Sequence, residues 1–191
     1  MLAVLALISP LITNDRHRRL HYLQYSSKQG RKISRAQLAA TLLSAFALTT
    51  LLILVFSGIF SQNGTVVFWN NPVWSDYNSS AATVFNLTYG EWLIITAVLM
   101  YALALGVSMF AFILSRFSGN LITLMMKLIP VFAVIAYLSV SVFNGLFSMG
   151  NTLYSLLRFF GTEIYVCAVV VVIALAAAVF VMRREKRVDV A

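Results

Sequence analysis

The stretch LAATLLSAFALTTLLILVFSGIF, residues 38–60, contains no charged side chain. As an α-helix its 23 residues extend about 35 Å, because the rise is about 1.5 Å per residue. That length exceeds the hydrocarbon core of a bilayer, which is about 30 Å thick. We therefore predict that residues 38–60 form a transmembrane helix.

Two further stretches predict membrane-spanning helices by the same reasoning. Residues 92–115 open with an interfacial aromatic, Trp92, and stop before Arg116, an arrangement that commonly brackets a membrane helix. Residues 164–182 stop before the basic run 183–187.

The apolar run between these stretches, residues 121–147, is too long for one simple crossing. We place the crossing at residues 128–147 and expect residues 121–126 to lie in the interface. This puts Pro130 in the first helical turn, where its missing N–H has little cost. Lys127 then extends its stem toward the headgroups. The predicted fold class is all-α, a polytopic transmembrane helical bundle with four full spans.

Composition agrees with a lipid environment and excludes a soluble domain. Hydrophobic residues make up 61% of the chain and charged residues 10%, with a mean hydropathy of +0.89. The net charge of +8 is divided among segments between apolar runs. A nucleic-acid partner would need one continuous basic face, so we expect no nucleic acid and favour anionic lipid headgroups.

Residues 1–13 are apolar but extend only about 20 Å as a helix. They cannot cross a bilayer alone. No basic segment precedes them and no convincing cleavage site follows, so they do not resemble a secretory signal. We expect them to be the end of a truncated span.

The distribution of Lys and Arg predicts the orientation, since basic residues accumulate in loops that stay in the cytoplasm. Thirteen of the fourteen lie on one predicted side, and only Arg158 lies on the other. The multi-pass chain then has a cytoplasmic tail at 183–191 and an external loop at 61–90, in a plasma membrane. That loop either contacts substrate or is simply a polar connection.

The chain contains none of the common catalytic or nucleotide-binding motifs. It has no G-x-x-x-x-G-K-[ST], no H-E-x-x-H and no G-x-S-x-G. His17 and His21 are four residues apart, so they would share one face of a helix, but no Cys accompanies them. We therefore expect no metal site there. The single Cys167 lies in an apolar run and fits a buried hydrophobe. We expect no enzyme activity and no bound cofactor.

Residues 14–36 form a basic and partly apolar segment before the first full span. Asn14 and Asp15 suit a helix N-terminus, and Leu20 and Leu23 give that helix an apolar side. Such a helix either lies flat on anionic lipid or docks into a groove of a cytoplasmic partner. The residues alone leave both alternatives open.

The sequence PLITNDRHRRLHYLQYSSKQGRKISRAQLAA, residues 10–40, resembles the loop after the second span of exporter-type ABC transporter permeases of Gram-positive bacteria. In that family an acidic residue opens a short coupling helix that contacts the ATPase subunit. The resemblance implies that Asp15 opens the coupling helix, and that contacts with the ATPase subunit come from Arg18, Arg19, Leu20, Leu23 and Tyr25. Family members have six spans, whereas this chain shows four and a remnant.

Residues 148–162 resemble the re-entrant half-helices that close the pathway of such permeases from outside. The implied outer gate region contains Leu153, Tyr154, Leu157, Phe159, Phe160 and Glu163. An interfacial aromatic loop that anchors the last span is the other interpretation. Glu91 and Glu163 both stand near helix N-termini, where a carboxylate complements the helix dipole.

The resemblance implies a permease subunit that forms the translocation pathway with a second permease copy, identical or not. ATP and Mg²⁺ would then bind to a partner ATPase subunit and not to this chain. The alternative is a non-transporting membrane sensor or assembly protein whose basic loop binds anionic lipid. A secondary transporter is disfavoured, since ion coupling usually needs a charge or a broken helix at mid-membrane.

Overall fold

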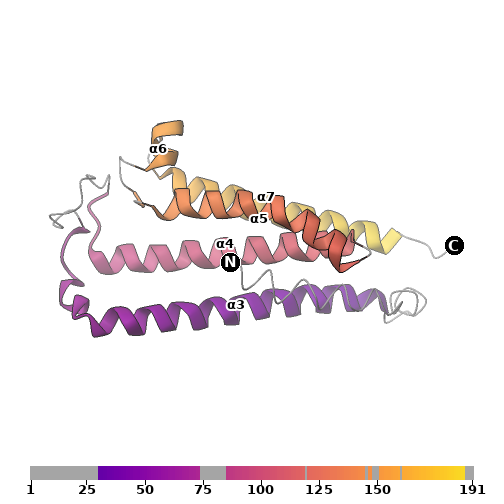
Figure 1. Ribbon diagram of the computed structural model, residues 1–191, viewed down its shortest axis with the longest axis horizontal. Helices are drawn as coiled ribbons and strands as arrows, with labels where there is room; N and C mark the ends of the chain where they lie inside the picture. Colours follow the sequence, from indigo (N-terminus) through magenta and orange to yellow (C-terminus); the bar gives the residue numbers. More distant parts are fainter. Residues whose placement is uncertain are drawn as a thin grey trace.

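The computed structural model describes residues 30–73, 85–118, 120–144, 146–147, 151–159 and 161–187. Within these ranges the chain forms four long helices, one short helix and one 3₁₀ turn (Figure 1). They are α3 (Gly30–Gln62), η1 (Thr65–Phe68), α4 (Tyr89–Arg116), α5 (Leu121–Phe143), α6 (Thr152–Leu157) and α7 (Thr162–Arg187). All four long helices are long and apolar enough to cross a membrane. The predicted all-α bundle of a multi-pass membrane protein is confirmed.

The long helices alternate in direction along the chain (Figure 1). The ends of α3 and α5 therefore lie beside the starts of α4 and α7, and we call this the α6 end. The opposite end, with the start of α3 and the last turns of α7, is the C-terminal end. Of the ten Lys and Arg residues in the described ranges, nine belong to the C-terminal end, and Arg158 belongs to the α6 end.

Helix α4 is the central helix of the bundle. It packs against α3, α5 and α7, and 56% of its most apolar stretch is buried, against 17–22% for the other three. Its buried residues include the small Ala104, Gly106, Ser108 and Ala111. A Cβ at Gly106 would lie 3.4 Å from Val170 Cγ1 of α7. Small side chains thus let neighbouring helices approach α4 closely, as is common in membrane bundles.

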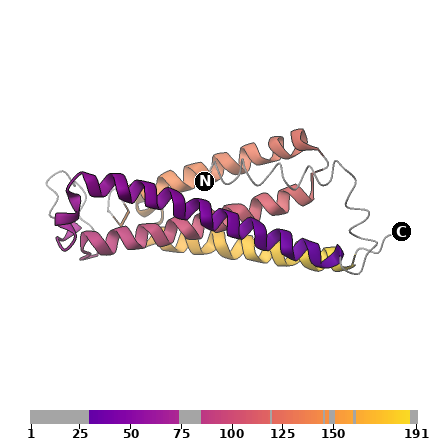
Figure 2. The ribbon, with the colours of Figure 1, turned by 90° about the horizontal axis from the view of Figure 1, so that it is seen from below.

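Three groups of buried apolar residues hold the helices together. One joins α3, α4 and α7 around Phe112, a second gathers around Leu103 and Cys167, and a third joins α4 to α5 around Leu124. Figure 2 shows α3 crossing α4 obliquely, with the first turns of α3 near the last turns of α7. The outward faces of α3, α5 and α7 expose large apolar side chains, which suits contact with lipid.

Helix α5 differs from the crossing predicted at residues 128–147. It begins at Leu121, so Pro130 lies inside the helix and not in its first turn. The helix starts early because Asn120 and Thr123 form a reciprocal cap, which supplies partners for terminal backbone groups. An internal proline is tolerated in membrane helices, where local adjustments satisfy the freed carbonyl. The helix ends at Phe143, and Asn144 is already extended.

Helix α4 begins as its sequence suggests. Thr88 accepts a hydrogen bond from Glu91 N, and the Glu91 side chain accepts one from Thr88 N at 2.9 Å. This capping box satisfies two terminal N–H groups, and the carboxylate lies in the first turn, where it complements the helix dipole.

Candidate functional site

The α6 end contains a short helix between two membrane crossings. Helix α6 has six residues and contacts both α5 and α7, as Figure 1 also shows. A helix of this length extends only about 9 Å, so it cannot cross a bilayer. It is a folded connection at one end of the bundle, and the described part of the predicted outer gate region belongs to it or lies next to it.

Glu163 ties this connection to α7. Its side chain lies in the first turn of α7 and is only 1% exposed. Oε1 accepts a hydrogen bond from the backbone N–H of Phe147, with an N···O distance of 3.2 Å. Phe147 has a φ of 62°, a left-handed conformation that is unfavourable for a bulky residue. The carboxyl group therefore helps to hold a strained turn after α5.

Asn151 makes a second polar connection in the same region. It is fully buried, and its Oδ1 accepts a hydrogen bond from Leu153 N at 2.8 Å. Its Nδ2 donates to the carbonyl oxygen of Asn144 at 3.2 Å. One amide side chain thus satisfies backbone groups at the end of α5 and the start of α6, where an unpaired group would be costly. Sequence reasoning missed Asn151, although an Asn just before a short apolar helix is a typical capping signal.

The structure separates the residues of the predicted gate region. Leu153 is buried with Leu99 and Cys167, and Glu163 is buried as described. Leu157 and Phe159 are exposed, Phe159 by 69%. Tyr154 lies in α6, its side chain is outside the described set, and Phe160 lies outside the described residues. Leu153 and Glu163 therefore stabilise the connection between α5 and α7. Leu157 and Phe159 face outward, where an apolar side chain can contact lipid or a partner.

The C-terminal end gathers basic side chains around the last turn of α4. Lys127 Nζ donates to the carbonyl oxygen of Phe117 at 2.9 Å, and the Arg184 guanidinium lies 5.5 Å from the centre of the Phe117 ring. Arg116 donates from Nη2 to Gln37 Oε1 of α3 and lies over the Phe112 ring. Cations at this position interact favourably with the carbonyl end of a helix.

The residues predicted to couple the chain to an ATPase subunit lie outside the described residues; they are Asp15, Arg18, Arg19, Leu20, Leu23 and Tyr25. Their place in the chain is nevertheless informative. They precede α3, which begins at Gly30 at the C-terminal end. The chain therefore enters α3 at the basic end of the bundle.

In the ranges that the structure describes, no three His, Cys, Asp or Glu side chains gather in a way that could hold a metal ion. Cys167 is a free thiol and is buried.

Comparison of the chain with family models, with curated proteins and with solved structures finds no match. Its function must therefore be argued from its own residues.

Proposed function

We propose that this chain is the membrane-spanning subunit of an ATP-driven exporter of the ABC type, and that a separate subunit hydrolyses ATP. The observation that carries the proposal is the sequence of residues 10–40, together with the end of the bundle at which α3 begins. That segment resembles the coupling loop of exporter permeases, and it leads into α3 at the basic end of the bundle. A helix that transmits force from an ATPase must stand at one end of the crossing helices.

The proposal assigns the C-terminal end to the cytoplasm of a Gram-positive bacterium. Nine of the ten basic residues in the described ranges belong to that end, and basic residues are retained on the side where translation occurs. The α6 end and the loop 61–90 are then external. Helix α6 and the Glu163 contact would form part of the outer closure of the pathway.

The interior of one copy supports a pathway between two copies rather than through one. The middle parts of the described helices contain no charged side chain. The buried hydroxyls of Thr49 and Ser108 donate to carbonyls of their own helices, at Ala45 and Leu105. Among the described residues the buried Ser139 Oγ of α5 lacks a hydrogen-bond partner, and one isolated hydroxyl does not line a polar channel. The substrate would therefore move along the interface with a second permease copy, against the exposed faces of α3 and α5.

The coupling contact is tested by copurification with an ATPase encoded beside this chain. The wild-type chain is expected to retain that subunit in mild detergent. The variant Leu20→Asp with Leu23→Asp is expected to retain at least about tenfold less, because two carboxylates cannot enter an apolar groove without a large desolvation cost. The control Ser27→Asp with Ser26→Asp adds the same charge outside the proposed contacts and should retain the subunit. Equal retention by all three proteins would refute the coupling role.

A second candidate function is a non-transporting sensor or assembly protein that uses its basic end to bind anionic lipid. It is favoured by the cluster of cationic side chains at the C-terminal end, which suits anionic headgroups. The same copurification separates the two candidates, since this protein would retain no ATPase even in its wild-type form.

A further inference from the structure

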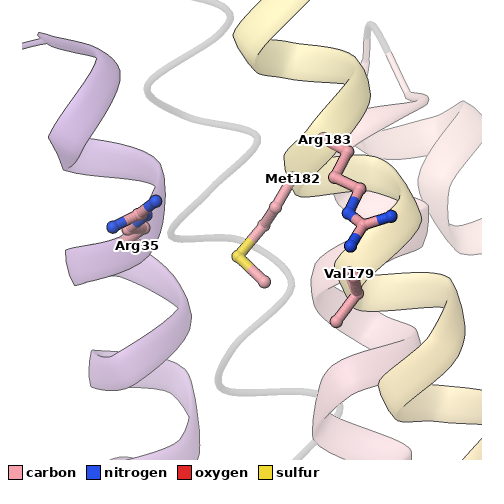
Figure 3. A pocket seen from close by; sticks show the side chains of 4 residues that line it. All are labelled: Arg35, Val179, Met182 and Arg183. Atoms are coloured by element: carbon pink, nitrogen blue, oxygen red, sulfur yellow. The ribbon is translucent and has the colours of Figure 1, made fainter.

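A cavity of about 270 Å³ lies at the C-terminal end, between the first turns of α3 and the last turns of α7 (Figure 3). It is lined by Arg35 of α3 and by Val179, Met182 and Arg183 of α7. Figure 3 shows Met182 extending from α7 toward α3, with Arg35 on the facing helix. Since a water molecule occupies about 30 Å³ in the liquid, the cavity has room for a group much larger than one ion.

Two cations share this cavity and lack a described acidic partner. Arg35 and Arg183 are both exposed and come from different helices. Glu91 and Glu163 begin α4 and α7 at the opposite end of the bundle. Glu185 belongs to the last turns of α7, two residues after Arg183, a spacing at which helical side chains do not face each other. Arginine binds phosphate oxygens through paired N–H donors, so the cavity favours a group with a negative phosphate.

The other described residues of the lining, Val179 and Met182, are apolar. Val179 and Arg183 are four residues apart, so they lie on one face of α7, with Val179 nearer the middle of the bundle. Met182 adds a flexible apolar side chain that adapts to irregular ligands. The cavity therefore changes from cationic to apolar toward the interior of the bundle. A glycerophospholipid has the same order of groups, a phosphate followed by acyl chains.

The cavity also lies at the ends of two helices that are long and apolar enough to cross a membrane. Arg35 is the first residue of the apolar crossing Arg35–Gln62, and Arg184 is the last of Thr162–Arg184. Basic residues at the ends of crossing helices commonly lie at the boundary between the hydrocarbon core and the headgroups, so we expect Arg35 and Arg184 at that boundary. Arg183 of the cavity is the residue before Arg184 and lies at the same level. Basic cavities between membrane helices are known to bind anionic headgroups.

We propose that this cavity is a binding site for an anionic phospholipid, with its phosphate between Arg35 and Arg183 and its glycerol and upper acyl chain against Val179 and Met182. The bound lipid would join α3 to α7 at the end of the bundle where the chain enters α3. This site does not depend on the exporter assignment, because its described lining residues belong to α3 and α7 and not to residues 14–29.

The test uses the purified full chain in a non-ionic detergent, where no charged bilayer surface contributes to binding. Titration with fluorescently labelled phosphatidylglycerol should show saturable binding, and labelled phosphatidylcholine should bind at least about tenfold more weakly. Arg35→Gln and Arg183→Gln should each raise the Kd for phosphatidylglycerol about tenfold, as expected for loss of hydrogen bonds to a charged group. The matched control Arg184→Gln removes one charge from the next residue, which does not line the cavity, and should change the Kd less than about twofold.

A second variant tests whether binding needs the open space of the cavity as well as the charge of its arginines. Val179→Phe keeps both arginines but fills part of the cavity, and it should also weaken binding about tenfold. Thermal unfolding of each variant verifies that the fold is retained. Equal effects of Arg183→Gln and Arg184→Gln would overturn the proposal. Complete displacement of the lipid by excess inorganic phosphate would also overturn it, since the site would then recognise a soluble anion.

Discussion

Replacement of Glu163 by alanine tests whether one buried carboxyl group stabilises the α6 end. The side chain is 1% exposed and accepts a hydrogen bond from Phe147 N–H at 3.2 Å. Its removal leaves that buried donor without this partner, which costs about 1–3 kcal/mol. Loss of a charge that complements a helix N-terminus adds about 0.3–1 kcal/mol. We expect the free energy of unfolding to fall by about 3 kcal/mol.

Cys167 supplies a reporter for this measurement. It is the only cysteine in the chain, it is 1% exposed, and it lies one helical turn after Glu163. A thiol-reactive dye that fluoresces on reaction should stay dark with the folded protein in detergent and become bright as the protein unfolds on heating. For a chain of this size a loss of about 3 kcal/mol lowers Tm by about 6–12 °C.

Two further variants show which part of the carboxyl group matters. Glu163→Gln keeps an acceptor for the Phe147 N–H and removes the charge, so its Tm should fall by less than half as much as that of Glu163→Ala. Glu91→Ala removes a first-turn carboxylate that is exposed, and its effect should also be small. If Glu163→Ala and Glu91→Ala lower Tm equally, or if neither lowers it, the proposed role of the buried hydrogen bond is refuted.

Three other predictions concern the helix contacts and the orientation. Tyr101 donates to the Thr50 hydroxyl at 2.8 Å. A double-mutant cycle of Tyr101→Phe with Thr50→Val should therefore give a coupling of about 0.6 kcal/mol in thermal unfolding and at most about 1.7 kcal/mol, the average and the maximum found for hydrogen bonds between membrane helices; a coupling near zero would contradict the contact. Gly106→Leu should lower the free energy of unfolding by about 1–3 kcal/mol, since a Cβ there already meets α7 at 3.4 Å, whereas Gly106→Ala should stay near wild type. In a cysteine-free background, Asn70→Cys should react with an impermeant maleimide on intact cells and Lys28→Cys should not, and the reverse pattern would show that the orientation is wrong.

Much of the architecture could be predicted from local patterns. The crossings 38–60, 92–115 and 164–182 each lie within an observed long helix, α3, α4 and α7 respectively. The acidic first turns at Glu91 and Glu163 are also present. These features depend on helix length, apolar content and capping, which are properties of short segments. The predicted start of α5 at residue 128 is wrong, because Pro130 lies inside the helix and Asn120 is the N-cap.

The predicted gate residues could be located only in part. Residues 148–162 resemble re-entrant half-helices, with an interfacial aromatic loop as the alternative, and part of this stretch forms the short helix α6. The sequence does not distinguish buried Leu153 from exposed Phe159, since both are apolar residues between glycines. For Asn151 a local capping signal covers only its contact with Leu153 N, whereas its hydrogen bond to the carbonyl oxygen of Asn144 at the end of α5 depends on the folded structure.

By itself the sequence determined how many long apolar helices form and which of their ends carry basic residues, because the bilayer imposes its thickness on each segment separately. Only the tertiary structure decided which helix is central. Helix α7 contains the most apolar crossing, yet α4 is the most buried. Lipid and protein interior are equally apolar, so hydropathy cannot separate a lipid-facing side chain from a packed one. The Glu163–Phe147 hydrogen bond and the cavity between Arg35 and Arg183 likewise depend on residues far apart in the chain, which are brought together by helix packing.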